Sequence, residues 1–192
     1  PAQTIDYGAK AVEPTKPTRT GYTFGGWYTE PNSLGALWNF STDTMPANDM
    51  TLYASWTSDI NTVTFYLNGG DSEAIPSQQV AYGENIEEPV DPTRTGHEFV
   101  SWNTKADGTG TTWDFATNTM PEKSVLLYAQ WSVNEYTVTY DLNSGDGVVP
   151  IDEQVDYGEL ISKPTNPTKT GYTFTGWSTD IEGSDIWNFA ID

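Results

Sequence analysis

Apolar and polar residues alternate in short stretches of the chain, and this alternation predicts β-strands. In the segment 62–68, the side chains of Val63, Phe65 and Leu67 fall on one face, and the residues between them fall on the other. A period of two with β-branched and aromatic residues is typical of a strand. The sequence Asn-Gly-Gly at 68–70 marks a turn at its end.

Further strands are expected after this turn, separated by loops that contain proline and glycine. They lie at 77–82, 97–103 and 126–131. Pro89 and Pro92 lack amide donors, so they indicate a loop rather than the middle of a sheet. The segment 113–120 is predicted to form one or two helical turns that end at Pro121. The pattern therefore favours a β-rich α+β fold with a short helix.

The same pattern recurs with a repeat period of ~75 residues, and this repetition organises the chain. The segments 14–29 (PTKPTRTGYTFGGWYT) and 164–179 (PTNPTKTGYTFTGWST) are identical at 12 of 16 positions, and 89–104 is a more divergent copy. Glycines and tryptophans keep the spacing: Gly21, Gly96, Gly171, Trp27, Trp102 and Trp177. We therefore expect three tandem copies of one small domain.

The predicted copies are 1–56, 61–131 and 136–192, joined by short linkers at 57–60 and 132–135. Because linkers this short restrict neighbouring units, the neighbouring repeats of the same chain are expected partners of each copy. Only the middle copy contains every predicted strand. The first copy lacks the strand equivalent to 61–70, and the last copy lacks the final strand. A missing strand exposes the edge and the core of its neighbour, so we expect the chain to be part of a longer array.

Aromatic residues are abundant, with 8 Trp, 11 Tyr and 7 Phe among 192 residues. A unit of ~75 residues buries only about 60% of its surface, and large aromatic side chains compensate by burying ~150–250 Å² each. Positions that are aromatic in every copy that reaches them are interpreted as core rather than as a platform for sugars. In the middle copy these are Phe65, Tyr82, Phe99, Trp102, Trp113, Phe115 and Trp131. Four tyrosines on less certain faces are candidate partner contacts: Tyr28, Tyr53, Tyr66 and Tyr128.

The charge and the residue types exclude several classes of function. The net charge is −19, which would repel nucleic acid and disfavours an anionic membrane surface. Without cysteine there is no thiol nucleophile, zinc-thiolate site or disulfide, and a single histidine excludes a multi-histidine metal site. No apolar stretch approaches the ~18 residues that a membrane-spanning helix needs. No cofactor is expected.

Residues with catalytic potential do not recur between the copies, so we assign no catalytic site. His97 stands where the other copies have Tyr22 and Tyr172, so the position does not require an imidazole. The carboxylates Glu87, Glu88 and Asp91 could form a glycosidase pair, but the other copies replace most of them. We interpret these carboxylates as a solvated acidic surface.

Three further patterns have structural interpretations. The segment 141–146 begins like a calcium-binding loop, but Asp146 replaces the glycine that such a loop needs at its sixth position, and no metal site is assigned. The recurring positive charges Arg19, Arg94 and Lys169 are expected to pair with acidic surroundings. Prolines with PxxP spacing, for example Pro14 and Pro17, are interpreted as wrapping of the domain body.

The order of these motifs resembles a known family. The run P-T-x-P-T-[RK]-T-G-Y-T-F-x-G-W, the preceding V-x-Y-G, the following W-x-F and the closing L-Y-A-x-W are similar to the Listeria–Bacteroides repeat, the B-repeat of internalin-type bacterial surface proteins. The resemblance implies tandem β-grasp-like modules, each with a mixed sheet and a short helix. It also implies an extracellular, often wall-anchored protein in which the repeats lie between an adhesive head and the anchor. The family has no catalytic residues to carry over.

Two hypotheses for the function follow from the sequence. In the first, the repeats are a non-enzymatic spacer that projects a binding head from a bacterial cell surface, and the acidity keeps the array soluble. In the second, the repeats themselves bind a host-cell protein or glycan weakly and gain avidity from the number of copies. A catalytic role is a third class, and no set of recurring residues supports it.

Overall fold

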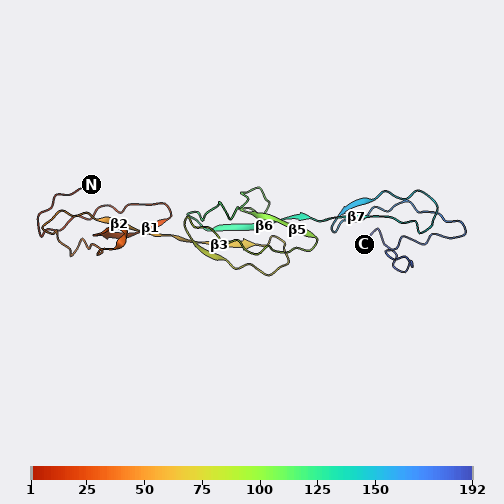
Figure 1. Cartoon of the computed structure of the whole chain (residues 1–192), viewed down its shortest axis with the longest axis horizontal. Helices are drawn as coiled ribbons and strands as arrows, with labels where there is room; N and C mark the ends of the chain where they lie inside the picture. Colours follow the sequence, from red (N-terminus) through yellow and green to blue (C-terminus); the bar gives the residue numbers. More distant parts are fainter. Residues whose placement is uncertain (1, 192) are drawn as a thin grey trace. The chain divides into compact units, whose positions relative to one another are not determined.

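The computed structural model describes residues 2–191 and consists mainly of β-strands and connecting loops (Figure 1). A single turn of 3₁₀ helix at Pro31–Ser33 is the only helical element among the described residues. The strands are β1 (Tyr22–Tyr28), β2 (Tyr53–Ser58), β3 (Ile60–Tyr66), β4 (Gln78–Ala81), β5 (His97–Asn103), β6 (Val125–Val133), β7 (Glu135–Val138) and β8 (Glu153–Asp156). The fold is therefore β-rich, as the alternation of apolar and polar residues predicts.

The chain divides into two compact units, and each unit combines segments from different parts of the sequence. The first contains the residues up to Tyr66, together with Ala74–Val90 and Trp102–Tyr128. The second contains Leu67–Glu73, Asp91–Ser101 and the residues from Ala129 onward. The first unit thus combines the predicted first copy with most of the middle copy, and the second combines the remaining segments of the middle copy with the last copy.

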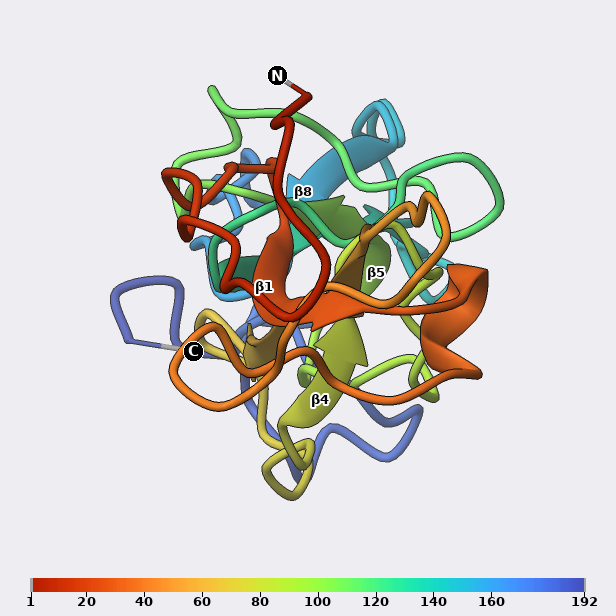
Figure 2. The ribbon, with the colours of Figure 1, turned by 90° about the vertical axis from the view of Figure 1, so that its left-hand side faces the viewer.

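The largest sheet has four strands in the order β4-β3-β6-β5 and is mixed. β3 pairs with β4 in antiparallel orientation and with β6 in parallel orientation. Figure 1 shows β3, β5 and β6 in the middle part of the chain, and Figure 2 shows β4. In the parallel pair, Phe65 lies opposite Leu127. Because side chains alternate between the faces of a strand, this register places the most apolar residues of both strands on the same side.

Two smaller sheets repeat parts of this arrangement. β1 pairs with β2 in antiparallel orientation from Tyr22↔Ser58 to Tyr28↔Tyr53, and β7 pairs with β8 from Glu135↔Asp156 onward. β7 and β8 begin one repeat period after β3 and β4, and β5 begins one repeat period after β1. The repeat in the sequence is therefore also a repeat of strand positions.

Buried apolar side chains gather around the four-stranded sheet. Val63 and Leu127 are fully enclosed, Trp102 is 2% exposed, and the ring of Phe65 meets the ring of Trp102 edge-on with centroids 5.1 Å apart. The first unit buries Val63, Phe65, Val80, Ile86, Trp102, Met120, Val125 and Leu127. No apolar residue of the last copy, within the part of the chain that the structure describes, is buried to this degree.

The predicted helix at 113–120 is wrong, because the structure has only one hydrogen-bonded turn there. The amide of Asn118 donates to the carbonyl oxygen of Asp114 at 2.8 Å, and the side chain of Asn118 accepts from the amide of Asp114 at 2.8 Å. The side chain of Asp114 also accepts from Thr117 at 2.8 Å. Asx and threonine side chains that bond the nearby backbone compete with a continuing helix, so the turn closes on itself.

The strands are close to their predicted positions and extend beyond them at the predicted linkers. β5 has the predicted bounds, whereas β6 runs to Val133. Residues expected to be linker are mostly strand, because β2 continues to Ser58 and β3 already begins at Ile60. The connection between neighbouring copies is therefore shorter than the sequence suggests.

Candidate functional site

A single residue connects the strands of the first two copies, and its backbone is hydrogen-bonded to both. β2 ends at Ser58 and β3 begins at Ile60, so only Asp59 lies between them. The amide of Asp59 donates to the carbonyl oxygen of Gly21 at 2.9 Å, and its own carbonyl oxygen accepts from the amide of Tyr82 at 2.8 Å. Gly21, Asp59 and Tyr82 are termed the first joint.

The same arrangement recurs one repeat period further along the chain. Asn134 alone separates β6 from β7. Its amide donates to the carbonyl oxygen of Gly96 at 2.9 Å, and its carbonyl oxygen accepts from the amide of Tyr157 at 2.8 Å. Gly96, Asn134 and Tyr157 are termed the second joint. Because an aspartate and an asparagine make the same two backbone bonds, the geometry depends on the backbone rather than on this side chain.

At each joint a tyrosine ring covers a glycine. Gly21 and Gly96 have φ angles of 74° and 70°, in the left-handed region that residues with a Cβ atom rarely adopt. A Cβ atom on Gly21 would lie 2.2 Å from Cγ of Tyr82, and one on Gly96 would lie 2.0 Å from Cδ1 of Tyr157. Both the backbone conformation and the ring contact therefore require glycine.

Aromatic residues beside the glycines complete the joints. The rings of Tyr22 and Tyr82 meet edge-on with centroids 5.8 Å apart, and His97 takes the place of Tyr22 at a distance of 6.4 Å from Tyr157. The guanidinium carbon of Arg19 lies 3.7 Å from the ring centroid of Tyr22. Edge-on rings and a cation over a ring face are favourable contacts, each worth about 0.5–1.5 kcal/mol. In the first joint, the recurring positive charge thus packs on an aromatic ring.

The corresponding residues near the two ends of the chain are exposed. Gly171 has φ 79°, and a Cβ atom placed on it would meet nothing within 4 Å. Tyr172 is 74% exposed, with Nζ of Lys169 5.0 Å from its ring centroid. At the other end, Tyr7 is 79% exposed. Lys169, Gly171 and Tyr172 are termed the open glycine face, and Tyr7 with Gly8 is termed the open tyrosine turn.

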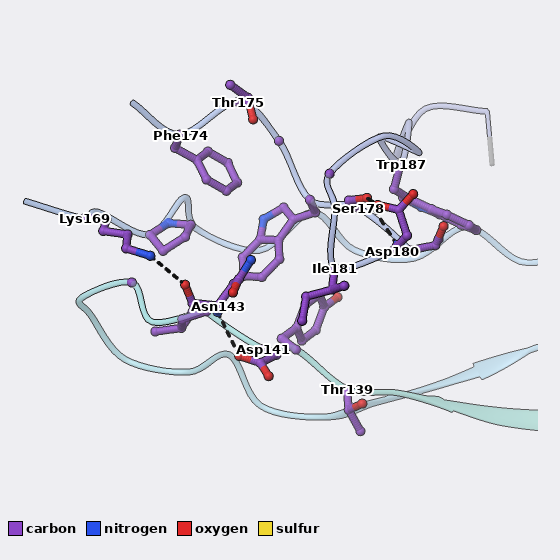
Figure 3. Close-up of a pocket in the computed structure, with 18 of the residues that line it drawn as sticks. Thr139, Asp141, Asn143, Lys169, Phe174, Thr175, Ser178, Asp180, Ile181 and Trp187 are labelled. Atoms are coloured by element: carbon purple, nitrogen blue, oxygen red, sulfur yellow. Dashed lines mark hydrogen bonds between the residues drawn. The ribbon is translucent and has the colours of Figure 1, made fainter. Parts of the chain in front are cut away.

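A cavity of about 820 Å³ lies in the last copy (Figure 3). Its two main walls are the segments 139–143 and 173–177. In Figure 3, Phe174 projects into the space from one segment, and Thr139 and Asp141 lie along the other. The side chain of Lys169 donates to the carbonyl oxygen of Asn143 at 3.0 Å and closes one end.

This cavity corresponds to the position that β6 occupies in the middle copy. There, β6 lies between β3 and β5, and its inward residues Val125, Leu127 and Ala129 are buried. The walls at 139–143 and 173–177 are the counterparts of β3 and β5, and neither wall is assigned as a strand. The cavity therefore lies in the last copy beside the counterparts of the two strands that flank β6 in the middle copy.

Tryptophan pairs form a second recurring feature. In each copy the backbone amide of one tryptophan donates to the carbonyl oxygen of an earlier one at 2.7–2.8 Å. The pairs are Trp38 with Trp27, Trp113 with Trp102, and Trp187 with Trp177. The indole nitrogens of Trp27, Trp38, Trp113, Trp177 and Trp187 are enclosed and have no hydrogen-bond acceptor among the described residues. An enclosed N–H group without an acceptor costs free energy, which the packing of these large rings must offset. The enclosure favours a packing role over a surface for sugars.

Aspartate side chains hold the loops through hydrogen bonds. Asp71 accepts from the hydroxyl of Thr95 at 2.5 Å, from the amide of Thr95 at 2.7 Å and from the hydroxyl of Thr93 at 3.0 Å. These bonds, chiefly the one from the Thr95 hydroxyl, hold the pKa of Asp71 below its usual value. The hydroxyl and amide of Ser184 lower the pKa of Asp180 to about 2. Stabilised carboxylates of this kind favour loop structure over proton transfer.

The aromatic residues predicted for the core differ in burial. Phe65 and Trp102 are buried. The indole N–H of Trp131 donates to the carbonyl oxygen of Leu67 at 2.9 Å, and its ring lies 5.7 Å from that of Phe99. Five of the predicted residues are half-buried: Tyr82, Phe99, Trp113, Phe115 and Trp131. Tyr82 packs on Gly21 of the preceding copy instead of filling the core of its own copy.

Among the four candidate partner tyrosines, two form a stacked pair. The rings of Tyr66 and Tyr128 are 5.0 Å apart and 14° from parallel, on directly paired positions of β3 and β6. Tyr66 is 45% exposed, and Tyr128 is half-buried. In the first copy, Tyr53 is exposed and Tyr28 is half-buried. The structure thus brings Tyr66 and Tyr128 together on one face of the four-stranded sheet.

The remaining candidates do not converge on a reactive centre. Glu87, Glu88 and Asp91 are exposed. Nδ1 of His97 lies 3.0 Å from the carbonyl oxygen of Thr95, beside the second joint. Among the described residues, no three acidic, histidine or cysteine side chains come together in a way that could hold a metal ion. Nor does this part of the chain contain a helix with the length and hydropathy that crossing a bilayer requires.

Comparison with known proteins relates the chain to a repeat family. The model of the Listeria–Bacteroides repeat domain matches residues 1–55, 62–130 and 136–192. Internalin H of Listeria monocytogenes is 43% identical over 141 residues, which cover 70% of this chain and 25% of the relative. A protein of Evansella cellulosilytica whose name includes the words "membrane protein" is 37% identical over 187 residues, covering 97% of this chain and 27% of the relative. The chain thus spans about a quarter of the length of these relatives.

Proposed function

Because the chain belongs to the Listeria–Bacteroides repeat domain family, we propose that it is a non-enzymatic stalk module of a bacterial surface protein. In this role, tandem β-grasp-like copies of about 75 residues, a size within the usual range of domains, hold a binding domain at a distance from the cell. The mixed sheet with its parallel β3–β6 pair supports the assignment of the copies to this fold. The copies differ from the expected module in the absence of a helix at 113–120.

The observation that carries this proposal is the pair of joints. A single residue, Asp59 or Asn134, connects neighbouring copies, and both of its backbone groups are hydrogen-bonded. A short connection that is bonded on both sides restricts the motion of one copy against the next, unlike a flexible linker rich in glycine and serine. Restricted joints are what a spacer needs, because each added copy then adds length.

The relatives and the composition support a location outside the cell. One relative is named Internalin H, and two others have names that include the words "membrane protein". The chain has a net charge of −19 and no cysteine. High net charge of one sign limits self-association, which suits an array held at a surface. Anchoring to the cell wall through other parts of the parent protein belongs to this proposal.

A distance measurement tests the stalk. Because the chain has no cysteine, fluorescent dyes can be attached to cysteines introduced at the exposed residues Gln3 and Glu182. Extra copies of residues 61–135 are then inserted after Glu135. The distance between the dyes should rise in equal steps with copy number, whereas a Gly/Ser insertion of equal length raises it only as the square root of its length. No rise with copy number, or saturable binding of the purified chain to host cells, would contradict the stalk.

The stacked tyrosines favour one second candidate, weak binding of a glycan or host protein by the repeats. Tyr66, which is 45% exposed, and the half-buried Tyr128 form a stacked aromatic pair on β3 and β6. The last copy has Asp141 at the position of Tyr66, so binding at this pair would not increase with every copy. A glycan array should then show binding that Tyr66→Ala abolishes and that Val100→Ala, an exposed substitution on β5, leaves unchanged.

A further inference from the structure

We propose that the tyrosine over the glycine is a docking contact by which one copy of the repeat binds the next, and that the open glycine face at Lys169, Gly171 and Tyr172 binds the Tyr–Gly turn of another copy. The inference rests on the proposed function in one respect, namely that copies follow one another in a stalk. It goes further by naming the partner of this surface and the residues that select it.

The first support is that the contact occurs twice with different neighbouring residues. Tyr82 covers Gly21 in one joint, and Tyr157 covers Gly96 in the other. The ring beside the glycine is a tyrosine in the first joint and His97 in the second. The glycine and the covering tyrosine are kept in both joints while the neighbouring ring changes, so the contact does not depend on that ring.

The second support is that the open glycine face has the conformation of an occupied one. Gly171 has φ 79°, close to the 70° of Gly96, and nothing lies where the covering ring would be. Lys169 lies over the ring of Tyr172, as Arg19 lies over the ring of Tyr22 in the first joint. The face is therefore preorganised, which lowers the cost of binding.

The third support is that the turn which fits this face is also preformed at the other end of the chain. The amide of Gly8 donates to the carbonyl oxygen of Met45 at 2.9 Å, and the amide of Gly83 donates to that of Met120 at 2.9 Å. The open tyrosine turn is thus held by the same backbone bond as the turn that carries Tyr82. The two exposed surfaces are complementary halves of one joint.

The occupant we assign is another copy of the repeat rather than an unrelated ligand. The backbone bonds of a joint require a linking residue whose amide reaches the glycine carbonyl and whose carbonyl reaches the tyrosine amide, as Asp59 and Asn134 do. Covalent linkage also supplies a high effective concentration, which a contact of one ring and one glycine needs.

A matched pair of glycine substitutions tests the docking contact in the full chain. Gly96→Ala and Gly171→Ala introduce the same methyl group at nearly the same φ, but only the first meets a ring, 2.0 Å from Cδ1 of Tyr157. We expect Gly96→Ala to lower the melting temperature by about 4–8 °C more than Gly171→Ala does. Equal losses for the two variants would overturn the proposal.

A double-mutant cycle separates the contact from a general failure to fold. Tyr157→Ala removes the ring that clashes with the new methyl group, so Gly96→Ala should cost less in that background, and Tyr157→Phe should retain the full penalty because the nearby atoms are ring carbons. The amide of Asn134 should also exchange faster in Gly96→Ala, since its bond to residue 96 opens. Additive losses with unchanged exchange would contradict the docking contact.

The open glycine face is tested by extending the chain with a second copy of residues 119–192 after residue 192. Gly171→Ala should then become as damaging as Gly96→Ala, because a new Tyr–Gly turn covers it. An unchanged effect of Gly171→Ala in the extended chain would overturn the assigned partner. If docking fails while the stalk holds, the dye distance still rises in equal steps with copy number but Gly171→Ala stays harmless in the extended chain, whereas a distance that does not rise is the failure of the stalk.

Discussion

The middle copy, 61–131, and the last copy, 136–192, have the same motifs but very different interiors. Val63 is fully enclosed and Trp102 is 2% exposed, whereas their counterparts Val138 and Trp177 are only half-buried. The strand pattern differs in the same way, because 97–103 is a strand and the equivalent 172–178 is not. Similar residues therefore reach different burial in two copies of one domain.

The two copies also differ in one central strand of the sheet. In the middle copy, β6 lies between β3 and β5 and buries Val125, Leu127 and Ala129. In the last copy, the corresponding position is the cavity of Figure 3. A central strand pairs with both neighbours and contributes its apolar face at once, so the remaining strands depend on it.

The largest effect is expected for a substitution that makes the middle copy resemble the last one. Leu127→Asp replaces a fully enclosed side chain of β6. Removing a buried leucine costs about 2–5 kcal/mol, and an unpaired buried carboxylate adds to that, so we expect loss of the main cooperative unfolding transition. Leu126→Asp, in the same strand but 45% exposed, should change stability by no more than about 0.5 kcal/mol. Thermal unfolding measures the stability of both variants. Similar losses of stability in the two would contradict the role of β6.

A second change makes the last copy resemble the middle one. A copy of residues 119–133 appended after residue 192 supplies a strand equivalent to β6. Because each large inward side chain contributes about 1.5–3 kcal/mol when buried, we expect a stabilisation of roughly 3 kcal/mol and a blue shift of tryptophan fluorescence. The same extension with Leu127→Asp in the appended copy is the control, and an equal gain from it would argue against filling of the cavity.

A third experiment compares one substitution at equivalent positions. Val63→Ala should cost about 1–3 kcal/mol, since each deleted buried carbon costs about 0.5–1.5 kcal/mol. Val138→Ala should cost less than half as much, because Val138 is half-buried and its surroundings can relax. Denaturant titration of both variants measures the difference. Equal costs would show that the interiors of the two copies are alike.

The smallest expected effect concerns the loop aspartates. Asp71 accepts three hydrogen bonds, which lower its pKa from 3.8, whereas its counterpart Asp146 accepts a 3.4 Å bond from the amide of Thr170. A carboxyl group whose pKa is lower in the folded than in the unfolded protein stabilises the folded state at pH values above the unfolded pKa. This stabilisation is lost as the pH falls through the pKa of the folded protein. Asp71→Asn should therefore lower the melting temperature near neutral pH more than Asp146→Asn does, and the difference should fade in acid. A difference that persists at the lowest pH would contradict this cause.

Local patterns predicted the strands well and the helix badly, for physical reasons. The alternation in 97–103 predicts a strand, and a strand forms there because its two faces differ in polarity. The segment 113–120 fails as a helix because Asp114 and Asn118 bond the nearby backbone. Side-chain to backbone bonds of this kind depend on rotamers that residue spacing does not reveal.

The glycines of the joints follow from the repeat pattern, but the contacts of these glycines with another copy do not. Gly21 and Gly96 recur at the repeat spacing, and a recurring glycine before a strand indicates a turn. The tyrosine that covers each of them belongs to the following copy. Tyr82 and Tyr157 recur at the repeat spacing, but recurrence alone does not distinguish a core position within one copy from a contact between two copies.

By itself, the amino-acid sequence determined the period of the repeat, the positions of most strands, the exclusion of thiol and multi-histidine chemistry, and the resemblance to a repeat family. These properties depend on residue types and on short-range spacing. Tertiary structure decided which aromatic residues are enclosed and how one copy meets the next. Burial of Trp102 and the contact of Tyr82 with Gly21 join segments far apart in the chain, so they depend on strand pairing that a local pattern does not specify.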